Sequence, residues 1–155
     1  MGSGATAIDV TVFDAVGRVV ALTDGLGRTT SFGYDAVGRQ TSVTNGAGET
    51  SMSAFDVAGQ LVSSTNPLGE STSYGYTAAG YLDTVTDPLG RVTTFGYDLV
   101  GRQISTTDPL GRSSSSVYDA AGQLTSATSA EGVAMSYGYD PVSYTHLTLP
   151  TKCWV

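Results

Sequence analysis

Apolar and polar side chains alternate along short segments of this chain, and glycine-containing turn signals separate the segments. Thr30, Phe32 and Tyr34, for example, alternate with Ser31 and Gly33. A period of two places successive side chains on opposite faces of a β-strand. The pattern therefore predicts strands with one aromatic face and one face of small polar residues. No segment of about ten residues shows the 3.6-residue periodicity of a helix, so the expected fold class is all-β.

The pattern recurs every 21 residues, which indicates a repeat architecture. The aromatic column is Phe13, Tyr34, Phe55, Tyr76, Tyr97, Tyr118 and Tyr139. A first glycine column follows it at Gly17, Gly38, Gly59, Gly80, Gly101 and Gly122, and a second lies at Gly27, Gly48, Gly69, Gly90, Gly111 and Gly132. Because one hairpin cannot bury an apolar face alone, stability must come from neighbouring repeats.

Each glycine column closes a tight turn. Residues 14–17 read Asp-Ala-Val-Gly, and residues 87–90 read Asp-Pro-Leu-Gly. Asp at the first position of a type I turn can accept a hydrogen bond from the backbone two residues on, and Gly supplies a positive φ. We therefore expect three-residue hairpin loops with a glycine bulge, joining strands such as residues 18–23 and 28–34. A threonine column ends the first strand of each repeat and is expected to support strand pairing. Its members are Thr23, Thr44, Thr65, Thr86, Thr107 and Thr128.

Charge and hydropathy exclude two classes of partner. The formal net charge is -7, from 7 basic and 14 acidic residues, which disfavours binding to a phosphate backbone. No apolar stretch approaches the roughly 18 residues of a membrane-spanning helix. Residues 1–6 lack the basic start and apolar middle of a secretion signal, so neither a membrane span nor a signal is expected in this sequence.

The last fifteen residues differ in composition from the repeats. They hold the chain's only His, Lys, Cys and Trp, at His146, Lys152, Cys153 and Trp154. Residues 141–151, PVSYTHLTLPT, read as the in-frame translation of a sequencing-library transposase adapter. We interpret residues 141–155 as a non-native tail and set aside a His–Cys catalytic pair within it. Residues 1–140 then carry six arginines against fourteen acids, a formal charge of -8.

The repeat resembles the YD repeats of RHS proteins. The aromatic-Asp-x-x-Gly-Arg unit occurs at residues 34–39 and 97–102, and Asp-Pro-Leu-Gly-Arg occurs at residues 87–91 and 108–112. The resemblance covers residues 9–140 in fixed register. The sequence departs from the pattern at Thr77 in place of the acid, at Gln60, Tyr81 and Gln123 in place of the arginine, and at 129–132 in the last second-turn position.

The resemblance implies a β-sheet that spirals around a hollow cocoon. In this family such shells occur in bacterial polymorphic toxins, insecticidal toxin complexes, wall-associated proteins and animal teneurins. The cocoon encloses a carboxy-terminal toxin or effector domain, and a segment that closes the repeats cleaves itself in many members. Neither that segment nor a toxin domain is recognisable here, so no functional residue is carried over. The implied location is secreted or bacterial cell surface, as part of a larger protein.

The expected organisation has three parts. Residues 1–12 are a partial repeat leading into the array, residues 13–140 hold six repeats and the start of a seventh, and residues 141–155 are the tail. We expect the natural chain to continue beyond Asp140, so that this sequence is a fragment.

The repeat positions that could carry chemistry each have a structural interpretation. The Asp columns could bind calcium, but each turn supplies one carboxylate and already uses it as a cap. The Tyr column could stack on sugars, although core packing accounts for it. The six arginines are interpreted as solvated or paired with nearby Asp. Serines have no His, Lys or Cys in residues 1–140 to activate them, so no catalytic, cofactor-binding or metal-binding residue is predicted.

Two functions remain open from the sequence. The first is a non-catalytic structural wall segment that encapsulates a toxin or effector domain. The second is a cell-surface adhesive array whose repeats bind a carbohydrate. Glycan binding that is lost on Tyr-to-Ala changes would favour the second, and a closing segment with a variable toxin downstream would favour the first. An enzyme is not expected.

Overall fold

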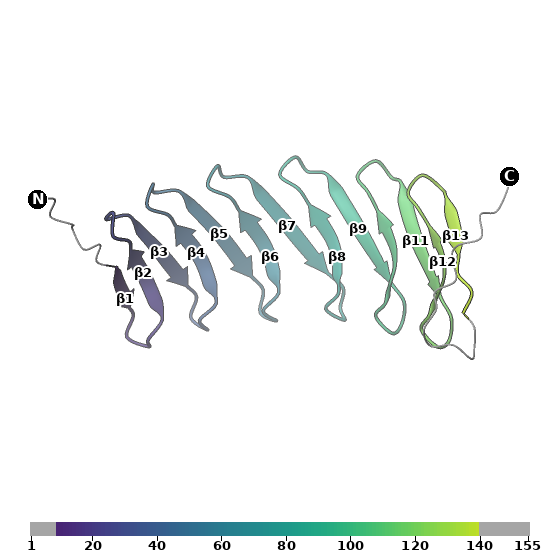
Figure 1. Cartoon of the computed structure of the whole chain (residues 1–155), viewed down its shortest axis with the longest axis horizontal. Coiled ribbons are helices and arrows are strands. Elements are labelled where there is room, and N and C mark those ends of the chain that lie inside the picture. The colour runs from purple at the N-terminus through teal and green to yellow at the C-terminus, as the bar shows by residue number, and fades with distance from the viewer. Residues whose placement is uncertain (1–8, 140–155) are drawn as a thin grey trace, which may run out of the picture. The chain divides into compact units, whose positions relative to one another are not determined.

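The computed structural model describes residues 9–139, which form antiparallel strands joined by tight turns and contain no helix (Figure 1). Residues 1–8 and 140–155 lie outside the described residues, so the expectations for the amino-terminal segment and for the tail with His146 and Cys153 fall there. The strands are β1 (Val10–Phe13), β2 (Val19–Thr23), β3 (Thr29–Tyr34), β4 (Gln40–Thr44), β5 (Thr50–Phe55), β6 (Leu61–Thr65), β7 (Ser71–Tyr76), β8 (Leu82–Thr86), β9 (Val92–Tyr97), β10 (Gln103–Thr107), β11 (Ser113–Tyr118), β12 (Leu124–Thr128) and β13 (Ala134–Ser136).

The strand order in the open sheet follows the order in the chain, which confirms the predicted all-β repeat fold. The chain divides into two compact units, Met1–Ser73 and Tyr74–Val155. In the first unit β1 to β6 pair in sequence and β6 pairs with the start of β7. In the second unit β8 to β13 pair in the same antiparallel manner.

The turns have the predicted geometry. We call the turns that close on the first glycine column the first turns, and those that close on the second column the second turns. The first turns are residues 14–17, 35–38, 56–59, 77–80, 98–101 and 119–122; the second turns are residues 24–27, 45–48, 66–69, 87–90, 108–111 and 129–132. All twelve glycines have φ between 77° and 91°. In each turn the glycine N–H donates to the carbonyl of the first turn residue, at 2.8–3.1 Å, which confirms the glycine-bulged hairpin loop.

The strands begin one residue later than predicted. Arg18 and Arg28, expected to start strands, precede β2 and β3. The carbonyl of each arginine accepts the N–H of the first turn residue, Asp14 or Asp24, and the arginine N–H donates to that residue's carboxylate. The arginine therefore completes the turn rather than the strand pairing.

A second β-bulge, separate from the turn glycine, lies on the strand that follows a first turn. The alternation in the sequence did not predict it. In the β3–β4 hairpin the register runs from Gly33↔Ser42 to Tyr34↔Gln40, so Thr41 is an extra residue on β4. The same shift occurs in the β1–β2, β5–β6, β9–β10 and β11–β12 pairs, whereas pairs joined by second turns are regular. A bulge bends the strand and redirects side chains, so it changes the geometry at this end of the hairpin.

The two predicted faces are present. Phe32 lies opposite Val43, and Leu22 lies opposite Thr30, on the aromatic face. On the other face Gly33 lies opposite Ser42, and a Cβ added to this glycine would overlap the serine hydroxyl. Gly75 and Gly96 have the same relation to Thr84 and Ser105. Glycine within a strand thus marks a close cross-strand approach by a hydroxyl side chain.

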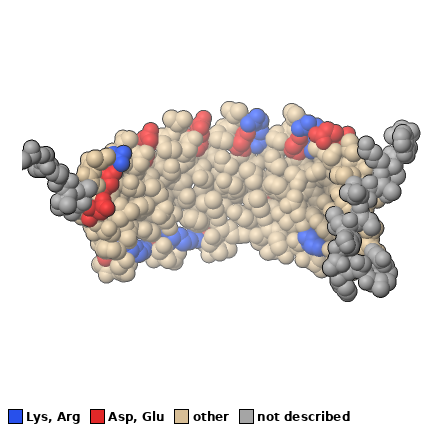
Figure 2. All heavy atoms as spheres, in the orientation of Figure 1, with Lys and Arg blue, Asp and Glu red and all other residues tan. Residues whose placement is uncertain are grey.

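Neither face of the sheet is covered. Among residues 9–139 no side chain is buried, and the aromatic side chains of β3 are half-buried. Charged side chains gather at the turns, and most of the broad face in view carries none (Figure 2). Across the part of the chain that the structure describes, no helix is long and apolar enough to cross a bilayer.

Candidate functional site: the contacts between successive repeats

Each Asp–Arg turn is held by one carboxylate that uses both of its oxygens. Asp35 Oδ1 accepts the backbone N–H groups of Val37 at 3.0 Å and Arg39 at 2.9 Å, and Asp35 Oδ2 accepts Arg39 Nε–H at 2.7 Å. The other turns of this kind pair Asp14 with Arg18, Asp24 with Arg28, Asp87 with Arg91, Asp98 with Arg102 and Asp108 with Arg112, at 2.5–2.6 Å. All six arginines of the repeats are therefore paired with Asp, which is one of the two arrangements that the sequence left open.

These bonds lower the pKa of the carboxyl groups below the ordinary value of 3.8. At Asp14 and Asp87 the largest influence is the backbone N–H of the arginine four residues on, and at Asp24 it is the Arg28 side chain. At Asp35, Asp98 and Asp108, loss of hydration is the largest single influence and raises the pKa, but the arginine and backbone hydrogen bonds together outweigh it. The carboxylates are thus fixed in their charged form as turn caps.

Two second turns replace the Asp–Arg pair by an Asn–Glu pair with the hydrogen bond reversed. Asn45 Oδ1 accepts the backbone N–H groups of Ala47 and Glu49, and Asn45 Nδ2 donates to Glu49 Oε2 at 2.7 Å. Asn66 and Glu70 make the same contacts. An amide presents a donor where the carboxylate presents an acceptor, so the partner must change from Arg to Glu.

The first-turn arginines also contact the next repeat. The Arg39 guanidinium lies over the Phe55 ring with its Cζ 5.0 Å from the centroid, and Arg39 Nη1 donates to the Asp56 carbonyl at 2.8 Å. Arg18 lies over Tyr34 at 4.8 Å and Arg102 over Tyr118 at 4.7 Å, each with a longer bond to the next turn at 3.3–3.4 Å. Each arginine therefore joins its own turn to the aromatic residue and turn 16 or 17 residues on.

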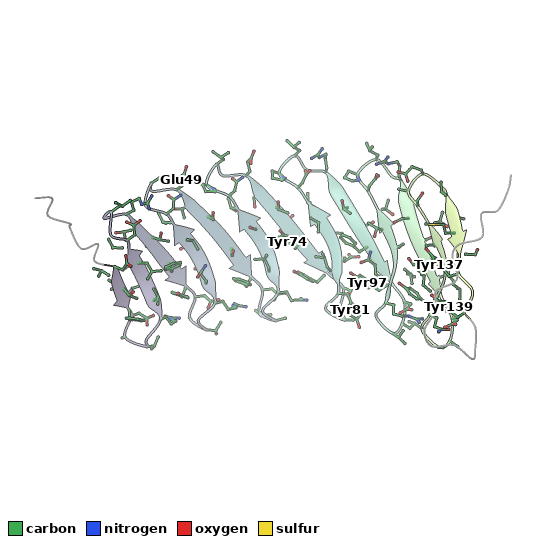
Figure 3. All side chains as sticks on the ribbon, viewed as in Figure 1. Glu49, Tyr74, Tyr81, Tyr97, Tyr137 and Tyr139 are labelled. Atoms are coloured by element: carbon green, nitrogen blue, oxygen red, sulfur yellow. The ribbon has the colours of Figure 1, made fainter. Side chains whose placement is uncertain are left out.

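Tyr81 occupies the arginine position of one first turn and makes an equivalent contact by different chemistry. Its ring stacks on Tyr97, 16 residues on, with centroids 5.0 Å apart and an interplanar angle of 23° (Figure 3). Its hydroxyl lies against Gly101 in the next first turn. In the same turn Thr77 replaces the acid, and its hydroxyl accepts the Tyr81 backbone N–H at 3.1 Å. Aromatic stacking thus replaces the cation–π contact.

Tyrosine hydroxyls in the aromatic column bond to the preceding strand. Tyr34 Oη donates to the Val19 carbonyl at 2.7 Å, and Tyr139 Oη donates to the Leu124 carbonyl at 2.9 Å. Tyr118 makes a longer contact of 3.4 Å with the Gln103 carbonyl. At these positions the ring therefore reaches across the strand that lies between two members of the aromatic column.

The threonine column joins strands across the second turns. Thr23 Oγ1 and Thr29 Oγ1 lie 2.8 Å apart, as do Thr44 Oγ1 and Thr50 Oγ1. Thr107 pairs with Ser113 at 2.8 Å. The hydroxyls therefore serve strand pairing, in agreement with the sequence-based interpretation.

The caps and the pairing of arginine with Asp could be read from the sequence, whereas the contact of the first-turn arginines with the next repeat was not predicted. A detectable signal existed, since each of these arginines precedes a column aromatic by 16 residues, and Tyr81 precedes Tyr97 by the same interval. For the described residues, no group of three or more His, Cys, Asp or Glu is placed to hold a metal ion. Within residues 9–139 the arrangement can hold repeats together, and in that range no histidine, lysine or cysteine lies beside a nucleophile.

A protein-family model, described as RHS Repeat, matches residues 13–50, 55–91, 84–113 and 118–142. These matches cover most of the sequence, and the chain therefore belongs to the RHS repeat family. The resemblance inferred from the motifs is confirmed. No curated protein sequence matches this chain.

Solved structures of Tc toxin components have a similar fold. The TcdB2–TccC3–Cdc42 crystal structure has a TM-score of 0.65 at 20% identity, over 85% of this chain and 8% of that chain. TcdB2–TccC3–TEV has a TM-score of 0.68 at 17% identity, with the same coverage of 85% and 8%. A Photorhabdus luminescens Tc holotoxin pore with a TccC3 variant has a TM-score of 0.63 at 19% identity, again over 85% and 8%. At these identities the likeness concerns the fold, and this chain spans a small part of the length of those proteins.

Proposed function

We propose that residues 13–140 are a non-catalytic wall segment of an RHS shell that encloses a toxin or effector domain. The shell would belong to a larger protein that is secreted or displayed on the bacterial cell surface. The observation that carries the proposal is the use of the repeat's polar side chains to join one turn to the next, as Arg39 does with Phe55 and Asp56. The fold shared with TcdB2–TccC3 structures supports it.

Residues 141–155 are, in this proposal, a non-native tail, and the natural protein continues from Asp140 with further sequence. Amplification of the native locus across the codon for Asp140 tests this part. Genomic sequence that diverges from PVSYTHLTLPT at residue 141 is the expected result. Genomic sequence that encodes residues 141–155 and then a stop codon would contradict it.

Encapsulation is tested on the longer protein obtained from that locus. We expect a domain carboxy-terminal to the repeats to resist limited proteolysis in the intact protein and to be cleaved rapidly when it is expressed alone. Equal cleavage rates in the two forms would contradict enclosure. Mass spectrometry of the time course identifies the fragments.

A carbohydrate-binding array is the second candidate, because no residue of 9–139 is buried and the aromatic rings of β3 are only half-buried. A glycan panel probed with the 155-residue chain and with Tyr74→Ala separates the two functions. Tyr74 lies on β7 and is not a member of the stacked pair Tyr81–Tyr97 (Figure 3). Binding that Tyr74→Ala abolishes would favour the array, and absence of binding favours the wall.

A further inference from the structure

We propose that Asn45 is a site of spontaneous deamidation, in which the backbone nitrogen of Gly46 displaces the side-chain amide. Asn45 and Gly46 lie in the exposed second turn between β4 and β5, next to Glu49 (Figure 3). The chain's other asparagine, Asn66, lies in the equivalent turn of the next repeat. The two asparagines make the same capping contacts, and their turns differ at the next two residues, Gly46-Ala47 against Pro67-Leu68.

The residue that supplies the attacking nitrogen, Gly46, is exposed to water. Gly46 has no side chain to shield its backbone nitrogen, and Asn45 is exposed as well. Hydrogen bonds of this turn engage other amides, those of Asn45, Ala47, Gly48 and Glu49. Within the described residues the Gly46 N–H thus takes no part in the turn's bonding and can lose its proton to solvent.

Hydrogen bonds within the turn polarise the side-chain carbonyl of Asn45, whose Cγ is the atom attacked. Asn45 Oδ1 accepts the backbone N–H groups of Ala47 at 2.9 Å and Glu49 at 3.0 Å. When a nitrogen attacks Cγ, negative charge develops on this oxygen, and donors already directed at it stabilise that charge. The cap that holds the turn therefore also favours the reaction.

The reaction balances without an added reagent other than water. The Gly46 nitrogen forms a bond to Asn45 Cγ and loses its proton, while the Cγ–Nδ2 bond breaks and ammonia leaves. Water then opens the resulting cyclic imide at either carbonyl, which gives aspartate or the isoaspartate isomer. The net change is the uptake of one water and the loss of one ammonia.

Asn66 has the same hydrogen bonds but cannot react in this way. Its Oδ1 accepts the N–H groups of Leu68 and Glu70 at 3.0 Å, and its Nδ2 donates to Glu70 at 2.7 Å. The next residue is Pro67, whose backbone nitrogen carries no hydrogen to lose and is closed in a ring. The capping geometry is thus held constant while the nucleophile is removed.

Deamidation would place the new carboxylate at position 45 next to the Glu49 carboxylate, where the turn now has an amide donor and a carboxylate acceptor. Asn45 Nδ2 now donates to Glu49 Oε2, and an aspartate at position 45 has no such donor. Where Asp occupies this position, as in Asp24 and Asp87, the residue four positions on is Arg. Deamidation therefore replaces an attractive contact by a repulsive one, and it acts on this second turn alone.

The test incubates the 155-residue chain at mildly alkaline pH and locates the modification by mass spectrometry. Cleavage after arginine releases residues 40–91 as one peptide, which contains both asparagines, so fragment ions compare the two sites in the same molecule. We expect the mass increase of deamidation at Asn45 and an unchanged Asn66. Equal modification at the two sites, or an intact Asn45 when the urea-unfolded chain has reacted, would overturn the proposal.

Two variants should reverse which asparagine deamidates. Pro67→Gly should make Asn66 reactive, and Gly46→Pro should protect Asn45. A Cβ at position 46 would lie 2.7 Å from Arg28 Cβ, so Pro67→Gly is the primary variant, since it adds no atoms. If Asn66 stays unmodified in Pro67→Gly while Asn45 reacts, the following residue does not control the reaction, and the proposal fails.

Discussion

The two kinds of turn are built alike and differ in what they contact. At the first turns the arginine side chains are 30–35% exposed, because each lies over an aromatic ring of the next repeat. At the second turns the arginines are 53–67% exposed and pair with the Asp of their own turn. Arg112 has in addition a 3.9 Å ion pair with Glu131. The first turns thus carry the cation–π contacts between repeats, whereas the second turns contribute this one long ion pair.

A single cap motif therefore serves two purposes. In both kinds of turn the Asp carboxylate fixes the local backbone. At the first turns the bulge lies beside the turn, and the guanidinium extends to the next aromatic residue and carbonyl. The strand pairs joined by second turns are regular. There the side-chain hydrogen bond can reverse its direction, from Arg donating to Asp to Asn donating to Glu, because both partners belong to one turn.

The largest expected effect is that of acid, which acts on all six Asp–Arg turns. The pKa values of the six Asp carboxyl groups lie below 3.8 in the folded chain. The stabilisation that the charged carboxylates give to the folded chain is therefore present above pH 3.8 and is lost as the pH falls through the folded pKa values. We expect urea midpoints, measured by circular dichroism, to hold near neutral pH and to fall below about pH 3.8. A midpoint that rises on acidification would contradict this sign.

Replacing the turn glycine by alanine should cost more stability at a first turn than at a second turn of the second unit. Gly101 and Gly111 have φ of 84° and 79°, so alanine at either is strained by about 1–2 kcal/mol. A Cβ at Gly101 would also overlap Tyr81, whereas a Cβ at Gly111 meets nothing within 4 Å. Gly101→Ala should therefore lower the free energy of unfolding more than Gly111→Ala. Equal losses would show that Tyr81 adds nothing at this turn.

Arginine truncation makes the same comparison in the first unit. Arg39→Ala removes a cation–π contact worth about 0.5–1 kcal/mol and a hydrogen bond to the next repeat. Arg28→Ala removes a contact within an exposed turn only. We expect a lower urea midpoint for Arg39→Ala at matched protein concentration, since association alters apparent stability. A double-mutant cycle with Phe55→Ala measures the coupling, which vanishes if the ring contact contributes nothing.

The smallest effect is expected when one inter-repeat contact replaces another. The double change Thr77→Asp and Tyr81→Arg restores the Asp–Arg pattern of the first turns and exchanges ring stacking on Tyr97 for a cation–π contact. Both interactions are worth about 1 kcal/mol, so stability should change little. Tyr81→Ala, which leaves no ring or guanidinium on Tyr97, is the control and should destabilise. A large loss in the double variant would show that the two contacts are not interchangeable.

The repeat, the turns and the two faces of the sheet follow from the amino-acid sequence alone. These features depend on local chemistry: Asp35 caps its own turn, Gly38 supplies a positive φ, and the alternation at Phe32 and Tyr34 sets the faces. The capped turn, its glycine and the alternating strand then recur every 21 residues along the chain. Pairing of each arginine with its Asp could be predicted for the same reason, because the partners are four residues apart.

Which arginines reach the next repeat depends on how the strands pair in the folded sheet. Arg18 and Arg28 follow the same Asp-x-x-Gly pattern, yet one lies over Tyr34 and the other stays within its turn. The difference depends on the one-residue bulge beside the first turns and on which side chains the neighbouring strand presents there. Strand register brings together residues 16 or 17 positions apart, and that geometry follows from pairing between strands rather than from any single repeat.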